Sequence, residues 1–141
     1  MKKILVLVCA ICFSTIFVSS VLVSAKDEIS VADIHLLKGK WEGYLKIYGG
    51  SQEQQRSLEV LNDDIPLKGV LYIYGGLSGN SSRNFDNGII EKGKLVIRFE
   101  KYQWIRLALR NKKGKLELRG DFRWADLRGD WTGEIYFEKV E

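Results

Sequence analysis

Apolar and polar side chains alternate with a period of two along most of the chain after residue 40. In the segment 41–48, Trp41 and Leu45 share one face, whereas Glu42 and Lys46 share the other. This alternation predicts extended strands with one dry face and one wet face, which is typical of antiparallel sheets covered on one side only. The same pattern recurs in the segments 94–100, 105–110, 116–124 and 131–138.

Three weaker strands are expected at 55–61, 67–74 and 83–91, and the pair Asn87-Gly88 in the last of these predicts a bulge or a tight turn. Residues that favour turns separate the segments, so the chain is expected to form eight sequential strands. The predicted connections include the loops 49–54, 75–82, 101–103 and 125–129.

Closing eight sequential strands into an up-and-down barrel removes both exposed sheet edges. The first strand opens with Trp41 and Gly43 and the last with Trp131 and Gly133, and closure would make these two strands neighbours. We therefore predict an all-β, eight-stranded antiparallel up-and-down barrel; the alternative is a two-sheet β-sandwich. The expected interior wall includes Trp41, Phe99, Leu107, Phe122, Trp124 and Trp131.

The N-terminal residues have the features of a signal peptide. A charged start precedes a long apolar run that ends at Ala25, after which cleavage is expected. The prediction divides the chain into a signal peptide (1–25), a segment with a short helical turn (26–38) and the barrel domain (39–141). The product would be secreted or periplasmic, with no membrane span in the mature part; the alternative is that the run is retained as an anchor.

The distribution of charge and the scarcity of histidine and cysteine limit the functions that the chain could have. Residues 92–128 carry twelve Lys or Arg against four acids, which we interpret as a solvated sheet face; no nucleic-acid partner is predicted. His35 is the only histidine and both cysteines lie in the leader, so we predict no metal, no cofactor and no enzymatic activity. The acids near the last turn are interpreted as ion-pair partners and turn formers: Asp121, Asp126 and Asp130.

The start of the first strand resembles two families of ligand-binding proteins. A short capped turn followed by Gly39-Lys40-Trp41 is similar to the Gly-x-Trp signature of lipocalins and to the start of avidins. The resemblance to this calycin-like architecture implies an eight-stranded up-and-down barrel that holds a small ligand. The last strand lacks the arginine that lies over the tryptophan in lipocalins.

The leading functional hypothesis is an exported, non-enzymatic barrel that binds a small apolar or amphipathic ligand. In a closed meander, alternate loops gather at the end opposite the helical turn, and ligands usually enter a barrel through its open mouth. The rim residues expected to contact the ligand are Tyr48, Tyr74, Tyr102, Asp126 and Arg128.

The alternative hypothesis is an interaction or inhibitor module with a solid core. Tyrosines on the wet faces of the strands would then contact a protein or carbohydrate partner, because they supply contact area at a low cost in conformational entropy. The residues of this outer surface are Tyr44, Tyr72 and Tyr136.

Overall fold

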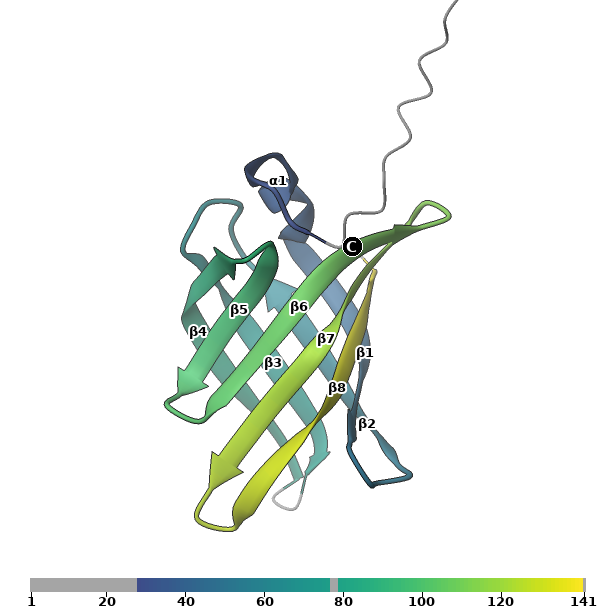
Figure 1. Ribbon diagram of the computed structural model, residues 1–141, viewed down its shortest axis with the longest axis vertical. Coiled ribbons are helices and arrows are strands. Elements are labelled where there is room, and N and C mark those ends of the chain that lie inside the picture. The colour runs from purple at the N-terminus through teal and green to yellow at the C-terminus, as the bar shows by residue number, and fades with distance from the viewer. Residues whose placement is uncertain (1–27, 77–78, 141) are drawn as a thin grey trace, which may run out of the picture.

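The computed structural model describes residues 28–76 and 79–140, and it confirms the closed eight-stranded antiparallel barrel with a short helical turn before it (Figure 1). The predicted signal peptide lies outside the described residues. The elements are η1 (Val31–Asp33), α1 (Ile34–Leu37), β1 (Gly39–Ile47), β2 (Glu53–Val60), β3 (Leu67–Gly76), β4 (Gly79–Glu91), β5 (Lys94–Glu100), β6 (Gln103–Lys112), β7 (Lys115–Asp126) and β8 (Gly129–Lys139).

Pairing between β1 and β8 closes the sheet and excludes the sandwich. The ladder runs from Trp41 opposite Lys139 to Ile47 opposite Gly133. Each remaining strand pairs with its neighbours in sequence, as a meander requires. Among the residues that the structure describes, no helix is long and apolar enough to cross a bilayer.

The connection between β3 and β4 is shorter than the sequence pattern predicts. The predicted loop 75–82 is wrong, because β3 continues to Gly76 and β4 already begins at Gly79. The polar residues at the start of β4 hide the strand from a hydrophobic pattern, whereas their backbone still pairs with β3, as in Tyr72 opposite Ser82. The loops 49–54 and 125–129 are shortened in the same way, since β2 begins at Glu53 and β8 at Gly129.

The predicted irregularity at Asn87-Gly88 is a bulge within β4. The register with β3 shifts between Leu67, opposite Gly88, and Gly69, opposite Phe85. Past the bulge only three residue pairs join β4 to β5. The side chain of Asn87 adds a further hydrogen bond between these two strands. Its Nδ2 donates to the Arg98 carbonyl oxygen at 2.6 Å.

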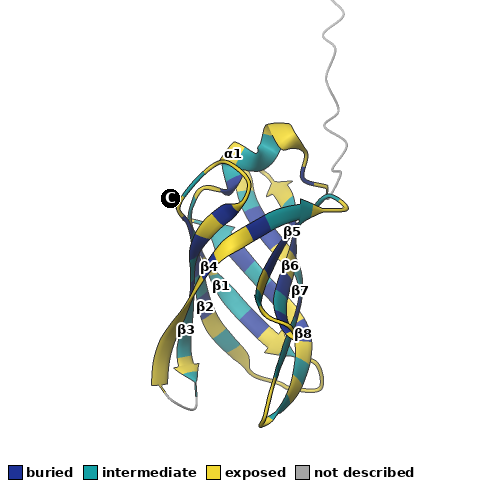
Figure 2. Ribbon diagram, turned by 90° about the vertical axis from the view of Figure 1, so that its left-hand side faces the viewer, coloured by how far each residue is buried: buried dark blue, intermediate teal, exposed yellow. Residues whose placement is uncertain are grey.

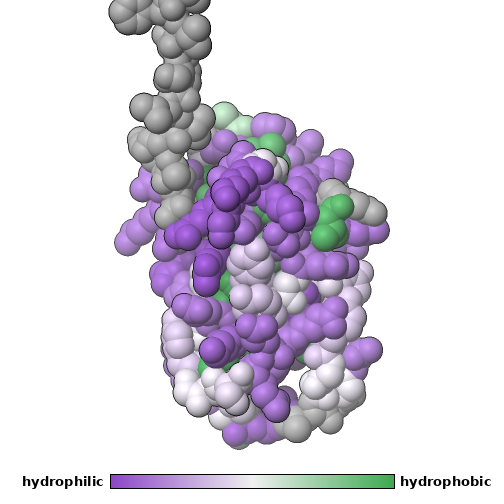
Figure 3. All heavy atoms as spheres, turned by 90° about the vertical axis from the view of Figure 1, so that its right-hand side faces the viewer, coloured by the Kyte–Doolittle hydropathy of each residue, from purple (hydrophilic) through white to green (hydrophobic). Residues whose placement is uncertain are grey.

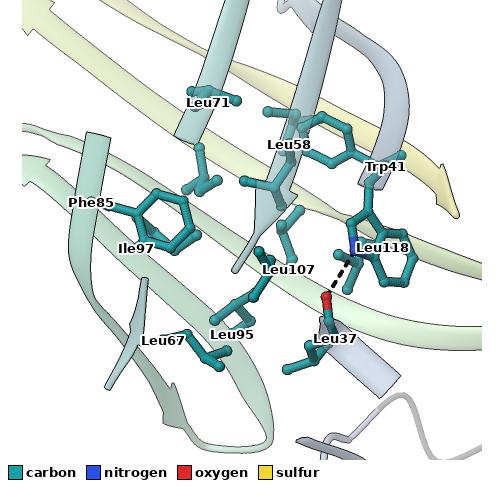
Figure 4. Close-up of a cluster of buried hydrophobic side chains, with 14 of the residues drawn as sticks. Leu37, Trp41, Leu58, Leu67, Leu71, Phe85, Leu95, Ile97, Leu107 and Leu118 are labelled. Carbon is teal, nitrogen blue, oxygen red and sulfur yellow. Dashed lines mark hydrogen bonds between the residues drawn. The ribbon is translucent and has the colours of Figure 1, made fainter. Parts of the chain in front are cut away.

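A capping box formed by Ser30 and Asp33 starts η1. Two side chains of the barrel, those of Trp41 and Lys139, hold α1 in place. The Nε1 of Trp41 donates to the carbonyl oxygen of Leu37 at 2.9 Å (Figure 4). The Nζ of Lys139 donates to the Leu36 carbonyl oxygen at 2.7 Å and lies 5.4 Å from the Trp41 ring centroid. Burial lowers the pKa of Lys139. The segment therefore covers one end of the barrel.

Buried side chains from α1 and the strands fill the end of the barrel that α1 covers. The side chains of Leu37, Trp41 and Leu118 meet there without exposure to solvent, and Figure 4 shows further side chains from several strands converging on them. Figure 2 shows the buried positions concentrated in the half near α1 and the middle of the barrel, whereas the far hairpins are mostly exposed.

Glycines on the inner wall allow neighbouring strands to approach closely. A Cβ at Gly43 would overlap the carbonyl oxygen of Tyr136, and a Cβ at Gly120 would overlap that of Arg106. A larger residue would force the strands apart at these points. The strand curvature therefore depends on these glycines.

Candidate ligand site at the open end of the barrel

The end of the barrel opposite α1, here called the open end, has no helical cover. The connections β1–β2, β5–β6 and β7–β8 lie there, together with the end of β3 and the start of β4 (Figure 1), and Figure 3 shows the molecular surface hollowed at this end. Four apolar inward-facing side chains near this end pack against the core, yet they remain partly exposed: Ile47, Phe99, Trp124 and Trp131.

Three aromatic rings form a row on the inner wall at the open end. Phe85 meets Phe99 edge-on at a centroid distance of 6.3 Å, and Phe99 meets Trp124 at 5.6 Å. The Cζ of Arg83 lies 5.5 Å from the centroid of Trp124. Because β4 and β7 are not neighbours in the ring of strands, Arg83 reaches across the opening. Its Nη1 lies 4.0 Å from the carboxylate of Glu100.

Arg56 is a buried cation on the inner wall. It lies on the same face of β2 as Leu58 and Val60, and only 8% of its surface is exposed. Its Nη1 donates to the Gln55 carbonyl oxygen at 2.8 Å and its Nη2 to Oε1 of Gln54 at 2.9 Å. Burial lowers the pKa of the guanidinium, although an arginine stays protonated at neutral pH.

No carboxylate balances this charge among the residues that the structure describes. No ion pair joins Arg56 to any of them within 4.0 Å. Its partners in register on the adjoining strands are Gly43 on β1 and Ile73 on β3. A buried charge without a counter-charge is costly, since burial removes its hydration.

Gln103 adds an unused acceptor on the opposite side of the barrel. Only 2% of its surface is exposed, and its Nε2 donates to the Ala125 carbonyl oxygen at 3.2 Å. Its Oε1 is buried and has no hydrogen-bond partner among the residues that the structure describes. Because β6 lies opposite β2 in an eight-membered ring, Gln103 and Arg56 face the interior from opposite walls.

The predicted rim tyrosines lie near the open end but not on its inner wall. Tyr48 follows Ile47 and is 63% exposed, and Tyr74 lines a hollow on the outer face. Tyr102 lies in the β5–β6 turn, where Lys101 and Arg123 approach its ring at 4.9 and 5.2 Å. Strand parity in the sequence predicts that Tyr48 and Tyr74 lie on the wet side of their strands, and the structure agrees, so these two tyrosines are not part of the inner wall.

The two charged rim residues predicted from the sequence pair with each other in the β7–β8 turn. Nη2 of Arg128 donates to Oδ2 of Asp126 at 2.9 Å, and the Arg128 backbone N–H donates to Oδ1 at 2.8 Å. These hydrogen bonds hold the pKa of Asp126 below its ordinary value. Both groups are therefore engaged in forming the turn.

The structure places the six residues of the predicted interior wall on the inner face, in two groups. Those nearer α1 are fully or almost fully buried, and those at the open end are partly exposed. The first group is Trp41, Leu107 and Phe122, and the second is Phe99, Trp124 and Trp131. The second group is the apolar part of the candidate site.

The outer tyrosines form contacts within the sheet. Tyr44 and Tyr136 are opposite one another on β1 and β8, and their ring centroids are 5.3 Å apart. The Tyr136 hydroxyl donates to Oε1 of Glu117 at 3.0 Å, and the Tyr72 hydroxyl to Oε2 of Glu59 at 3.4 Å. Two of the three outer hydroxyls are therefore already bonded to glutamates.

Tyr136 is expected to ionise later than a typical tyrosine. Burial and the bond to Glu117 raise its pKa to about 12. Because the unfolded tyrosine ionises near pH 10, this difference favours the folded state at neutral pH and is lost as the pH rises from 10 through 12. A spectrophotometric titration at alkaline pH should show one late-ionising tyrosine that is missing in Tyr136→Phe; identical titration curves would contradict the assignment.

The basic segment 92–128 contributes mainly to the outer surface. Acids on neighbouring strands pair with several of its arginines: Arg98 with Glu91 at 3.1 Å and Arg106 with Asp121 at 2.7 Å. A hollow of about 210 Å³ lies among these side chains and Trp104. A second hollow, of about 290 Å³, lies over β1, β2 and β3 and includes Tyr72 and Tyr74.

Sequence reasoning missed the polar half of the candidate site. The sequence does indicate the position of Arg56, because Arg56, Leu58 and Val60 alternate along a predicted strand and so lie on the same face. Gln103 has the same relation to Ile105. No group of His, Cys, Asp or Glu side chains suited to holding a metal ion occurs in the part of the chain that the structure describes.

Comparison with known proteins gives no relative: no family model, curated protein or solved structure matches this chain.

Proposed function

We propose that this protein is a non-enzymatic barrel that holds a small amphipathic ligand inside its open end. One observation carries the proposal: the aromatic side chains of the inner wall at this end remain partly exposed, namely Phe99, Trp124 and Trp131, whereas those in the middle of the barrel are buried. Exposed apolar surface costs about 25 cal/mol per Å², which a ligand covering it would recover.

The two halves of the barrel support different tasks. The packed half near α1 fixes the strands, as the unexposed Trp41 and Leu118 show. The open half combines an aromatic row with the unpartnered Oε1 of Gln103. A few polar groups set in an otherwise apolar recess are typical of sites for small ligands.

Lys139 of the last strand lies over Trp41 and bonds to the backbone of α1. In lipocalins an arginine of the last strand lies over the tryptophan, and in this chain a lysine occupies that place. The resemblance favours a ligand-holding barrel, and the predicted signal peptide at 1–25 favours a role outside the cytoplasm.

The test is saturable binding of a neutral environment-sensitive dye, Nile red, to the purified protein, with displacement by decanol. Trp124→Leu alters the aromatic row and should weaken dye binding about tenfold or more, since the buried area of an indole is worth more than 1.4 kcal/mol. Trp104→Leu is the matched control, because Trp104 lies on the outer face. Absence of saturable binding, or equal losses in the two variants, would contradict the proposal.

The outer tyrosine surface is the second candidate, as a docking site for a glycan or a protein. The observation that favours it is the hollow of about 290 Å³ where Tyr72 and Tyr74 lie beside Glu42 and Glu59. Glycan-array binding that is lost in Tyr74→Ala, while Nile red binding is unchanged, would favour this surface over the open end.

A further inference from the structure

We propose that the ligand carries a carboxylate, and that Arg56 binds it inside the barrel. This inference rests on the proposed function and specifies the chemical class of the ligand. It follows from one feature of the inner wall, namely an arginine with only 8% of its surface exposed that has no carboxylate partner among the described residues.

The charge of Arg56 favours an anionic ligand. Arg56 stands between Gly43 and Ile73 on the adjoining strands, so its neighbours in register offer it no counter-charge. An anion entering the open end would neutralise a charge that the fold itself leaves unbalanced. The gain is larger inside the barrel than in water, because the effective dielectric constant there is lower.

The hydrogen-bonding capacity of Arg56 favours a carboxylate. A guanidinium has five N–H donors in a planar fork, and two described bonds occupy Arg56, one to Gln55 and one to Gln54. The remaining donors suit the two oxygens of a carboxylate, which arginine often binds in a bidentate manner. Both existing acceptors are neutral amide oxygens, so the charge-assisted partner is still lacking.

The number of charges at the open end favours a ligand with a single negative charge. The other arginine at the opening, Arg83, already has Glu100 at 4.0 Å and lies against Trp124. One unbalanced cation matches one negative charge. A phosphate monoester carries about 1.5 to 2 negative charges at neutral pH, so a carboxylate fits this interior better than a phosphate.

The ligand therefore has an expected orientation. Its carboxylate meets Arg56 and Gln54, and its apolar part lies along the row formed by Phe99 and Trp124 toward the opening. The Oε1 of Gln103 on the opposite wall would accept a hydrogen bond from a hydroxyl or amide of the ligand, or from water.

The experiment compares amphiphiles that differ only in the head group: decanoate, decyl phosphate, decanol and decyltrimethylammonium. Their affinities are measured by displacement of Nile red from the wild-type protein and from Arg56→Met. Decanoate should bind the wild type at least about tenfold more tightly than the other three, as one charge-assisted interaction would provide. In Arg56→Met the affinity for decanoate should fall to that for decanol.

Arg119→Met is the matched control, because Arg119 lies on the outer face over the Tyr136 ring. It removes the same charge and should leave the preference for decanoate unchanged. A thermal melt gives a second reading: Arg56→Met should unfold at or above the wild-type midpoint, because it removes an unbalanced buried charge. A purely structural arginine would give a lower midpoint.

The outcomes separate the two proposals. If no amphiphile displaces the dye from the wild-type protein, the proposed function fails. If decanol binds as tightly as decanoate, or decyl phosphate binds more tightly, the function stands and the carboxylate assignment is wrong. A preference for decanoate that persists in Arg56→Met, or that disappears equally in Arg119→Met, also overturns the role of Arg56.

Discussion

Replacing Trp41 with alanine is expected to lower the free energy of unfolding by about 3–5 kcal/mol, as deletion of a buried aromatic side chain typically does. Trp41 is unexposed, and its Nε1 holds the Leu37 carbonyl oxygen. The ring also supports Lys139, whose Nζ binds the Leu36 carbonyl oxygen. The substitution therefore removes core volume and weakens both attachments of α1. Urea-induced unfolding measures the loss.

Two other variants control for this effect. Trp104→Ala removes an indole from the outer face and should cost about 1 kcal/mol or less, as surface substitutions generally do. Trp41→Phe keeps most of the packing and loses the bond to Leu37, so its cost should be intermediate. Equal losses in Trp41→Ala and Trp104→Ala would contradict the packing described for the closed end.

Gly120→Ala is expected to destabilise the barrel by about 3 kcal/mol or more, because overpacking of this kind forces the backbone to move. Its Cβ would overlap the carbonyl oxygen of Arg106 on the adjacent strand, which cannot yield as a flexible side chain would. Thermal and urea unfolding would both show the loss.

Gly50→Ala is the matched control. A Cβ at Gly50 would lie 3.2 Å from the Ile47 carbonyl oxygen, so only a small adjustment is needed. Its effect should stay within about 1 kcal/mol. If Gly120→Ala were tolerated as well as Gly50→Ala, the close approach of β6 and β7 could not be required for the fold.

The fold could be predicted because strand parity and sheet closure are both visible in the sequence. Trp41 and Gly43 at one end of the chain are matched by Trp131 and Gly133 at the other, and the structure joins those strands. The start of β4 could not be predicted, because its residues Asn80 to Ser82 are polar on both faces. Backbone pairing with β3 forms that strand, and backbone hydrogen bonds leave little trace in a hydrophobic pattern.

The candidate site was predicted only in part, for a related reason. Sequence pattern identified Phe99 and Trp124 as interior residues, because they continue an apolar face. It assigned no interior role to Arg56, because the inward face of a strand is recognised by its apolar residues and a cation is not expected there. Only the burial and the hydrogen-bond partners of the side chain show that Arg56 lies on the inward face despite its charge. Departures from pattern of this kind often mark functional positions.

The open end can be tested directly through the indole N–H resonances of the four tryptophans in a ¹H–¹⁵N spectrum. Trp124 and Trp131 face the interior of the open end, whereas Trp41 lies in the packed half and Trp104 outside the barrel. Titration with decanoate should shift the resonances of Trp124 and Trp131 in a saturable way and leave those of Trp41 and Trp104 nearly unchanged. Saturable shifts confined to Trp104, or no shift at any of the four, would contradict a ligand site inside the barrel.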